Sequence, residues 1–514
     1  MEHHLSCLPF LILISLCFIL FIPRILETIG KRFKAKGGKA WNLPPGPSNM
    51  PFIGSIHHLI GYIPHHRLRD LSLRYGPVMH LKLGEVSTIV VSSPQVAMDV
   101  LKTYDAIFAQ RPHQVGADIM CYGSTDIATS PYGGYWKQLR KICNVELLGV
   151  KRVRSFQSIR EEEVSNLMAY INISSKNGSC INLSEKVASM TSAITARAAF
   201  GLRCKDQDEF ISLIKKLVKV AESFIILDLF PSQKWLHLLS GMKPKLEELH
   251  KKFDMILDNI IGEAMEKSGE VEVEAESESL LSVLLNIKDH GALEFPLTTN
   301  NVKAVIMDMF VAGSDTSSAV IEWAISEMLK NPRVMIKAQQ EVRKIFGCKG
   351  YTNETVLQHL KYLKAVIKET LRLHPPFPLL LPRECRETCE IKGYTIPAGT
   401  KVIVNAWAIG RDSKYWSEAE KFIPERFMDC SIDYKGNNME YIPFGAGRRV
   451  CPGLSFGISG IELSLAHLLY YYNWELPSGT TMENLEMTEA LGSSSRRKTD
   501  LILVPISYNH VHVS

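Results

Sequence analysis

Residues 443–453 read Pro-Phe-Gly-Ala-Gly-Arg-Arg-Val-Cys-Pro-Gly, and residues 454–472 follow with apolar side chains three and four positions apart. This spacing predicts a helix that begins directly after the loop. Backbone amides and the positive dipole end of a helix favour thiolate over thiol at Cys451, and a metal would favour the thiolate further. Glycines without a Cβ let a flat ring system press against the loop, and Arg449 is placed to reach an anionic group at its rim.

The pattern aromatic-x-x-Gly-x-Arg-x-Cys-x-Gly in this loop resembles the haem-binding signature of the cytochrome P-450 monooxygenases. Five spaced identities carry it: Phe444, Gly447, Arg449, Cys451 and Gly453. The resemblance implies a haem (iron protoporphyrin IX) with Cys451 as its axial thiolate and with Phe444 and Arg449 as cofactor contacts. It also implies the mainly helical triangular prism of that family, with haem between a helix carrying Thr316 and the cysteine loop.

Hydrophobic periodicity independently predicts a mainly α fold with a minor β-sheet. Apolar residues recur at helical spacing in residues 302–329, 337–346, 361–373 and 454–472. Strand-like alternation occurs at residues 78–91 and 390–404, where Gly393 and Gly399 supply turns. Residues 270–279 form an acidic patch that we expect to be a solvated loop.

Within the predicted helix 302–329, residues 311–317 read Val-Ala-Gly-Ser-Asp-Thr-Ser. Glycine and hydroxyl side chains lower helix propensity there and can open the hydrogen-bond ladder into a groove. The segment is similar to the family's oxygen-site motif, which implies that Asp315 and Thr316 deliver protons to reduced oxygen. An acid beside a hydroxyl can relay protons through water.

Three charged residues are expected to act structurally. Glu369 and Arg372 lie three apart on one face of the predicted helix 361–373, and Arg426 lies in Pro-Glu-Arg-Phe at residues 424–427. Both segments match family motifs whose charges lock the cysteine side of the fold. Trp136 and Arg140, one helical turn apart, and Arg383 resemble positions that grip the haem propionates.

By resemblance to the family's substrate-contact regions, residues 112–131, 200–230, 307–316, 377–381 and 490–493 are expected to line a pocket. The predicted substrate-binding residues in these regions are Met309, Val311, Ala312, Phe377, Leu379 and Leu380. Their side chains would make the pocket mostly apolar, which suits a hydrocarbon-like ligand.

The N-terminal residues predict a membrane anchor. Residues 5–22 carry no charge, and 18 helical residues at about 1.5 Å each nearly cross a hydrocarbon core of roughly 30 Å. Basic residues follow between Arg24 and Lys39, which places the body on the cytosolic side. We therefore expect a signal anchor at 1–22, a basic and proline-rich hinge at 23–48 and one domain at 49–514, at the endoplasmic reticulum membrane. A cleaved signal peptide is the alternative.

Composition limits the partners. Lys and Arg outnumber Asp and Glu by 59 − 54 = 5, which is too small an excess to indicate a nucleic-acid surface. Eleven scattered cysteines indicate reduced thiols facing the cytosol. Because no dinucleotide or flavin motif is present, electrons from NADPH would come through a separate cytochrome P-450 reductase, for which Arg448 and Lys421 are docking candidates.

The text of residues 381–387, 405–412 and 444–451 looks like the plant group that oxidises terpenoids and indole alkaloids. The resemblance therefore implies insertion of one oxygen atom from O2, by hydroxylation or epoxidation, into such a metabolite. Two alternatives remain open. Residues 453–457 fit a serine hydrolase elbow with Ser455 as nucleophile, followed by Asp500 and His510. A non-catalytic haem sensor would need Cys451 but not Asp315 with Thr316.

Overall fold

The computed structural model describes residues 41–508 except 202–208, 211, 215, 218, 221–226, 234, 236–239, 269–278 and 350–352. The predicted anchor and residues 23–40 of the predicted hinge lie outside the described residues, as does nearly all of the acidic patch. Residues 44–47 are not a free connection, because the amide of His80 donates to the carbonyl of Pro45 at 2.9 Å. Pro44 and Pro47 are buried there. This end of the proline stretch is part of the body.

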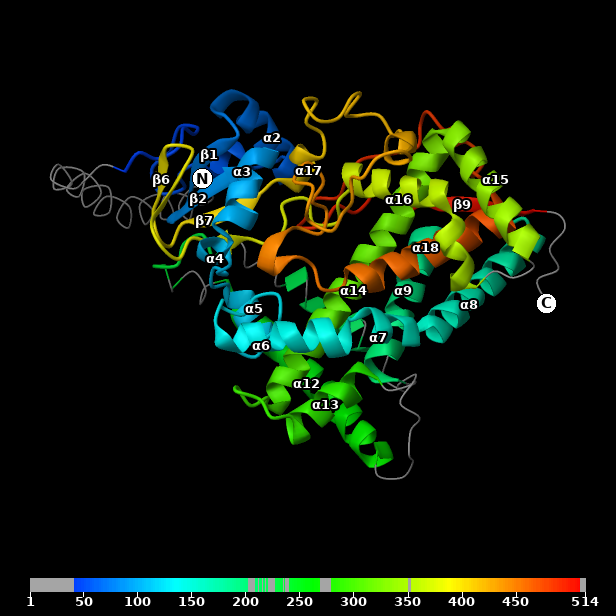
Figure 1. Ribbon diagram of the computed structural model, residues 1–514, viewed down its shortest axis with the longest axis horizontal. Coiled ribbons are helices and arrows are strands. Elements are labelled where there is room, and N and C mark those ends of the chain that lie inside the picture. The colour runs from blue at the N-terminus through cyan, green and yellow to red at the C-terminus, as the bar shows by residue number, and fades with distance from the viewer. Residues whose placement is uncertain are drawn as a thin grey trace, which may run out of the picture.

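The molecule is mainly helical, as expected, and its outline is roughly triangular (Figure 1). The longer helices are α2 (Pro64–Tyr75), α6 (Gly134–Ile142), α8 (Gln157–Lys176), α9 (Leu183–Phe200), α12 (Met242–Ser268), α13 (Leu280–His290), α14 (Thr299–Lys330), α15 (Pro332–Lys349), α16 (Lys361–Leu373) and α18 (Leu454–Tyr471). Short helices are α3 (Pro94–Met98), α4 (Asp105–Phe108), α5 (Val115–Met120), α7 (Val150–Ser155) and α17 (Ala406–Ile409). Single turns are η2 (Ile56–His58), η3 (Asp99–Thr103), η4 (Cys143–Leu147), η5 (Glu354–His359), η6 (Pro424–Phe427) and η7 (Gly447–Arg449).

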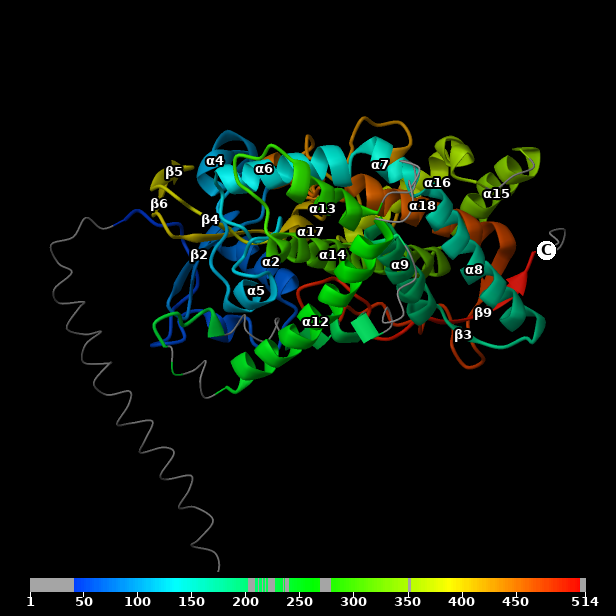
Figure 2. The same ribbon diagram turned by 90° about the horizontal axis from the view of Figure 1, so that it is seen from below.

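Helix α14 runs through the middle of the molecule (Figure 2). Thr298 begins it with a reciprocal capping box to Asn301, and Pro332, which starts α15, follows its last residue closely. Helices α9, α16 and α18 pack directly against it. Within the described residues, α14 is also the one helix long and apolar enough to cross a membrane, but 56% of its most apolar window is buried inside the protein. Its apolar character is therefore that of a core helix.

The strands form small sheets. Strands β1 (Val78–Leu83), β2 (Val86–Val91), β7 (Lys401–Val404) and β4 (Arg383–Glu384) form a sheet in that order, with β7 parallel to β2. Strands β3 (Ile181–Asn182), β9 (Ile502–Ser507) and β8 (Tyr472–Glu475) form the second sheet, and β5 (Cys389–Ile391) pairs with β6 (Tyr394–Ile396). Both predicted strand regions are confirmed. In Figure 1 the four-stranded sheet lies with α2 and α3 at one end, opposite α8 and α15.

Candidate functional site

The cysteine loop is shaped by close packing. The amide of Cys451 donates to the carbonyl of Phe444 at 3.0 Å, and η7 fills the turn between them. Gly447 has φ +70°, and a Cβ there would lie 2.0 Å from the carbonyl oxygen of Leu101. Only glycine allows this approach to η3. Gly445 and Gly453, by contrast, border the cavity described next.

The Cys451 side chain lies at the start of α18. Burial raises the pKa of its thiol, while the amides of Gly453 and Leu454 and the charge of Arg140 act in the opposite direction. The helix N-terminus therefore favours the thiolate as expected, but burial outweighs it. A metal cation bound at the sulfur would reverse the balance, because a coordinating thiol loses its proton.

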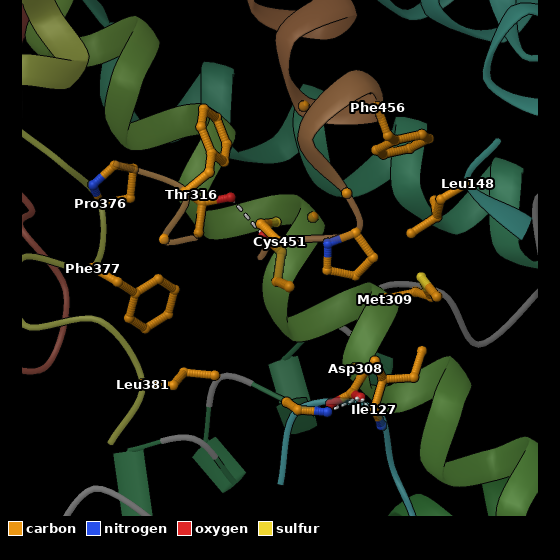
Figure 3. Close-up of a pocket in the computed structure, with 18 of the residues that line it drawn as sticks. Ile127, Leu148, Asp308, Met309, Thr316, Pro376, Phe377, Leu381, Cys451 and Phe456 are labelled. Atoms are coloured by element: carbon orange, nitrogen blue, oxygen red, sulfur yellow. Dashed lines mark hydrogen bonds between the residues drawn. The ribbon is translucent and has the colours of Figure 1, made fainter. Parts of the chain in front are cut away.

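A cavity of about 250 Å³ lies between α14 and the cysteine loop, with Cys451 on its wall. Figure 3 shows side chains from α14, residues 376–381, the cysteine loop and α18 gathered around one space. The wall is largely apolar and includes Leu148, Met309, Ala312, Phe377, Leu380 and Phe456. Such a wall suits an apolar ligand.

Four arginines line the same cavity: Arg111, Arg140, Arg383 and Arg449. Asp308 is the only acidic residue in its described lining. Burial and repulsion from Arg383 lower the pKa of Arg449 to about 9, and burial with repulsion from Arg449 and Arg383 lowers that of Arg111. This concentration of buried positive charge is suited to an anionic ligand.

Arg449 is held at three backbone carbonyls. It donates to Ala109 at 2.9 Å, to Ile127 at 3.2 Å and to Ser130 at 2.6 Å. Its guanidinium carbon lies 4.0 Å from the ring centroid of Trp136. These contacts fix the guanidinium at the cavity wall.

Arg383 and Arg140 are tied to the cysteine loop itself. Arg383 donates to the carboxylate of Asp105 and to the carbonyl of Ala446, both at 2.9 Å. Arg140 donates to the carbonyl of Val450, next to the cysteine. The loop and the cations therefore form one unit.

The site fits the haem that the sequence implies. A flat macrocycle with two carboxylates needs an apolar slot, a nearby thiol and cations at its edge, and the cavity combines these three features. Cys451 would hold the iron, and the arginines would meet the carboxylates. Of the predicted cofactor residues, Phe444, Arg140, Arg383 and Arg449 line the cavity. Trp136 does not, since it is buried beneath Arg449 and donates to the carbonyl of Ile127 at 3.0 Å.

Thr316 and Asp315, the two named residues of the predicted oxygen-site motif, lie in different surroundings. Thr316 lines the cavity, and its hydroxyl donates to the carbonyl of Ala312 at 2.6 Å. A Cβ on Gly313 would lie 3.1 Å from the hydroxyl oxygen of Thr195, so glycine lets α9 approach α14. Asp315 lies outside the described lining and forms an ion pair with Arg496. Its proton-delivery role stays a prediction.

Met309, Ala312, Phe377 and Leu380 lie in the cavity wall as predicted for substrate contacts. Val311 and Leu379 lie outside the described lining, and their role as substrate contacts stays a prediction. Val311 packs against the helical core, and Leu379 packs against the cluster beneath β1 and β2. None of residues 490–493, and none of the described residues in 200–230, belongs to the lining.

Glu369, Arg372 and Arg426 come together in the core beside α16. Arg372 donates to the two carboxylate oxygens of Glu369 at 2.7 and 2.8 Å, and Arg426 donates to one of them at 3.0 Å. Glu369 and Arg372 have no exposed side-chain surface. None of the three lines the cavity, which agrees with a structural role.

Arg111 and Asp308 border the cavity but were not predicted. Asp308 could have been found, because residues 308, 312 and 316 share one face of a helix. Its carboxylate accepts from the amides of Ile127 and Ala128 at 2.7 and 3.1 Å. No spacing in the sequence pointed to Arg111.

The elbow needed for a serine hydrolase is missing. Ser455 lies in the first turn of α18, and the 3-10 turn η7, rather than a strand, precedes it. Asp500 accepts a hydrogen bond from Asn182 at 2.7 Å, and His510 lies outside the described residues. We find no support for a triad at Ser455.

Comparisons with known proteins agree with this geometry. A family model described as Cytochrome P450 matches residues 44–503. Desmethyl-deoxy-podophyllotoxin synthase of Sinopodophyllum hexandrum is 54% identical over 92% of this chain and 93% of that protein. Premnaspirodiene oxygenase of Hyoscyamus muticus is 49% identical over 93% and 95%, and germacrene A hydroxylase of Barnadesia spinosa is 50% identical over 96% and 97%.

A solved structure of a zebra fish cytochrome P450 with abiraterone superimposes with a TM-score of 0.74. It is 24% identical and covers 87% of this chain and 99% of the other. At that identity the match concerns the fold alone. The mainly helical prism predicted from the sequence is thereby confirmed.

Proposed function

The chain belongs to the cytochrome P450 family and is a haem-thiolate monooxygenase, and we propose that it oxygenates a terpenoid at the cytosolic face of the endoplasmic reticulum membrane. Bound haem with a cysteine thiolate activates O2, so that one oxygen atom enters the substrate and the other leaves as water. The observation that carries the proposal is a largely apolar cavity whose lining includes Cys451, Thr316 and four arginines.

The protein's own residues provide binding, orientation and proton handling. Arg140, Arg383 and Arg449 would hold the carboxylates of bound haem, while the apolar wall orients the substrate and excludes water. Thr316 is the hydroxyl of the oxygen-site motif that faces the cavity, and it can pass a proton through water. Asp315 is the adjacent acid, held by Arg496.

The proposed substrate is an apolar terpenoid skeleton, oxidised by hydroxylation or epoxidation. Two relatives at 49 and 50% identity are named for premnaspirodiene and germacrene A. The side chains Met309, Ala312, Phe377 and Leu380 present no charge to a ligand. An indole alkaloid is the other class implied by the sequence, and its basic nitrogen would meet only one acidic residue, Asp308, in the described lining.

We propose that electrons come singly from a membrane-bound NADPH-cytochrome P450 reductase. Arg448, on the outer side of the cysteine loop, has half of its side chain exposed. Lys421 is more exposed and forms an ion pair with Glu418. These cations support docking of an acidic partner near Cys451.

The test is expression in microsomes with a plant reductase, followed by feeding of premnaspirodiene, germacrene A, a diterpene, an indole alkaloid and deoxypodophyllotoxin. The proposal expects NADPH-dependent products that contain one added oxygen atom from at least one terpenoid. Conversion of only deoxypodophyllotoxin or the alkaloid would contradict the substrate class. Haem-loaded protein that consumes no NADPH in the presence of the reductase and forms no oxygenated product would favour the non-catalytic haem sensor.

A further inference from the structure

A polar cluster that is buried except at His66 lies behind the cavity wall and is used by no step above. The carboxylate of Glu489 meets His65 Nε2 at 2.5 Å, His66 Nε2 at 3.4 Å and His374 Nδ1 at 3.7 Å. Ser495 donates its hydroxyl to the same carboxylate at 3.0 Å. We call these five residues the Glu489 cluster. Glu489 is 7% exposed and His374 is 6% exposed.

Burying this carboxylate has a cost that its neighbours offset. Burial would raise the pKa of Glu489, but the nearby imidazoles of His374, His65 and His66, of which His65 is hydrogen-bonded to it, hold that pKa well below its usual range. Burial lowers the pKa of His65 despite the nearby carboxylate. The pair is therefore best described as an ionised acceptor and a neutral imidazole donor. A buried polar group with several partners fixes the segments that carry them.

The cluster joins the C-terminal loop to the cavity wall. Residues 488–498 fold back on themselves, with a bridge between Glu489 and Arg497. Within this loop the amide of Ser495 donates to the carbonyl of Pro376 at 3.0 Å. Pro376 and Phe377 both line the cavity. The wall at Pro376 is therefore held by a loop that Glu489 anchors.

His374 holds the same wall from the other side. It ends α16 two residues before Pro376, and its Nε2 lies 2.8 Å from a carboxylate oxygen of Glu327. Its ring stacks on Trp323 with centroids 3.9 Å apart and planes 3° from parallel. The indole of Trp323 also donates to the carbonyl of Ser495 at 2.8 Å. The loop, α14 and the wall are thus joined at one point.

The same loop reaches the oxygen-site motif. Arg496, the residue after Ser495, forms the ion pair with Asp315, which precedes the cavity-lining Thr316. One anchored loop therefore contacts both the wall that orients the substrate and the acid expected to supply protons. This arrangement couples two functions through Glu489.

We propose that Glu489 is a positioning residue for the oxygenation, acting through the loop 488–498 on Pro376 and on Asp315. The inference rests on the proposed function for its catalytic consequence, but its effect on the cavity wall does not. Glu489 is not part of the cavity lining. A substitution at Glu489 is expected to change the affinity of the cavity for ligands and the amount of product formed per NADPH consumed, while haem stays bound.

The test compares Glu489→Gln with Glu486→Gln, a control two residues before the loop that is less buried than Glu489 and lies outside the Glu489 cluster. Imidazole and 4-phenylimidazole bind haem iron and are followed by absorbance. Glu489→Gln should change the Kd of 4-phenylimidazole by about fivefold, because hydrogen bonds to a buried charge are lost, and leave that of imidazole unchanged. Glu486→Gln should change neither.

Two further variants separate the contact of the loop with Pro376 from its contact with Asp315. Ser495→Ala removes one hydrogen bond to Glu489 and should shift 4-phenylimidazole binding in the same direction by a smaller factor. Arg496→Gln removes the contact with Asp315 and should lower product formed per NADPH consumed with premnaspirodiene, without changing azole binding. Glu489→Gln should lower that ratio as well.

Wild-type azole affinities in both Glu489→Gln and Ser495→Ala would overturn the inference. So would an equal effect of Glu486→Gln. Where premnaspirodiene is not a substrate, the azole comparison alone decides, because it needs only bound haem. A wild-type enzyme that oxidises no terpenoid would contradict the proposed function, but it would not affect the comparison of azole affinities.

Discussion

Glu369→Gln is expected to remove a large part of the stability of the folded protein. Glu369 has no exposed surface and accepts from Arg372 twice, from Arg426 once and from the amide of Ile423 at 2.8 Å. The neutral amide leaves two guanidinium groups without their counter-charge and turns one acceptor into a donor facing Arg372. Breaking a buried ion pair in this way costs about 3–5 kcal/mol.

The loss is large because a folded protein is stable by only about 5–15 kcal/mol in total. Glu425→Gln is the matched control. Glu425 also meets two cations, Arg333 at 2.6 Å and Lys337 at 3.1 Å, but all three side chains are partly or largely exposed. An exposed network of this kind is worth about 1 kcal/mol or less. The contrast between the two glutamates therefore isolates burial as the cause.

The assay is denaturant unfolding of haem-loaded protein, followed by haem absorbance and by the yield of carbon monoxide-binding protein. Glu369→Gln is expected to lose most of that yield, or to unfold at a far lower denaturant concentration than the wild type. Glu425→Gln should stay close to the wild type. Equal midpoints for the two variants would refute the assignment of Glu369 as the buried centre of the charge cluster.

Ala312→Leu should change the product ratio without loss of haem, because Ala312 lines the cavity. Val311→Leu, at a residue outside the lining, should leave the product ratio unchanged, and gas chromatography of the products measures that ratio. Burial raises the pKa of Glu462 to about 7. In the unfolded chain this carboxyl has a pKa of about 4.3, so the native state loses stability as the pH rises from there to about 7. Glu462→Gln should therefore melt at a higher temperature than the wild type at about pH 8, but not at about pH 4. Gly447→Ala places a Cβ 2.0 Å from a backbone oxygen and should lower haem retention, measured by absorbance, while Gly460→Ala in α18, with no atom nearby, should not.

Much of the fold followed from hydrophobic periodicity. Helix α16 has the predicted bounds of residues 361–373, and α18 ends one residue before the predicted end. Helix α14 begins three residues earlier than the apolar pattern, because the polar cap at Thr298 determines its start. Periodicity succeeds here because these helices bury one face continuously.

The site was less predictable, because side-chain direction depends on local backbone geometry. Leu379 and Leu380 are neighbours, yet Leu380 has φ +51° and faces the cavity while Leu379 packs beneath the sheet. Trp136 has the spacing of a cofactor contact but stacks on Arg449. The burial that raises the pKa of the Cys451 thiol comes from distant segments, so the loop sequence alone did not indicate it.

The reduced, carbon monoxide-bound absorption spectrum tests the central assignment most directly. With Cys451 as the thiolate ligand, the wild type should show the long-wavelength Soret band typical of a thiolate adduct, and Cys451→Ala should lose both that band and the activity. Cys143→Ala, at a buried cysteine outside the cavity lining, is the control and should keep the band. A thiolate-type band and full activity in Cys451→Ala would contradict the account.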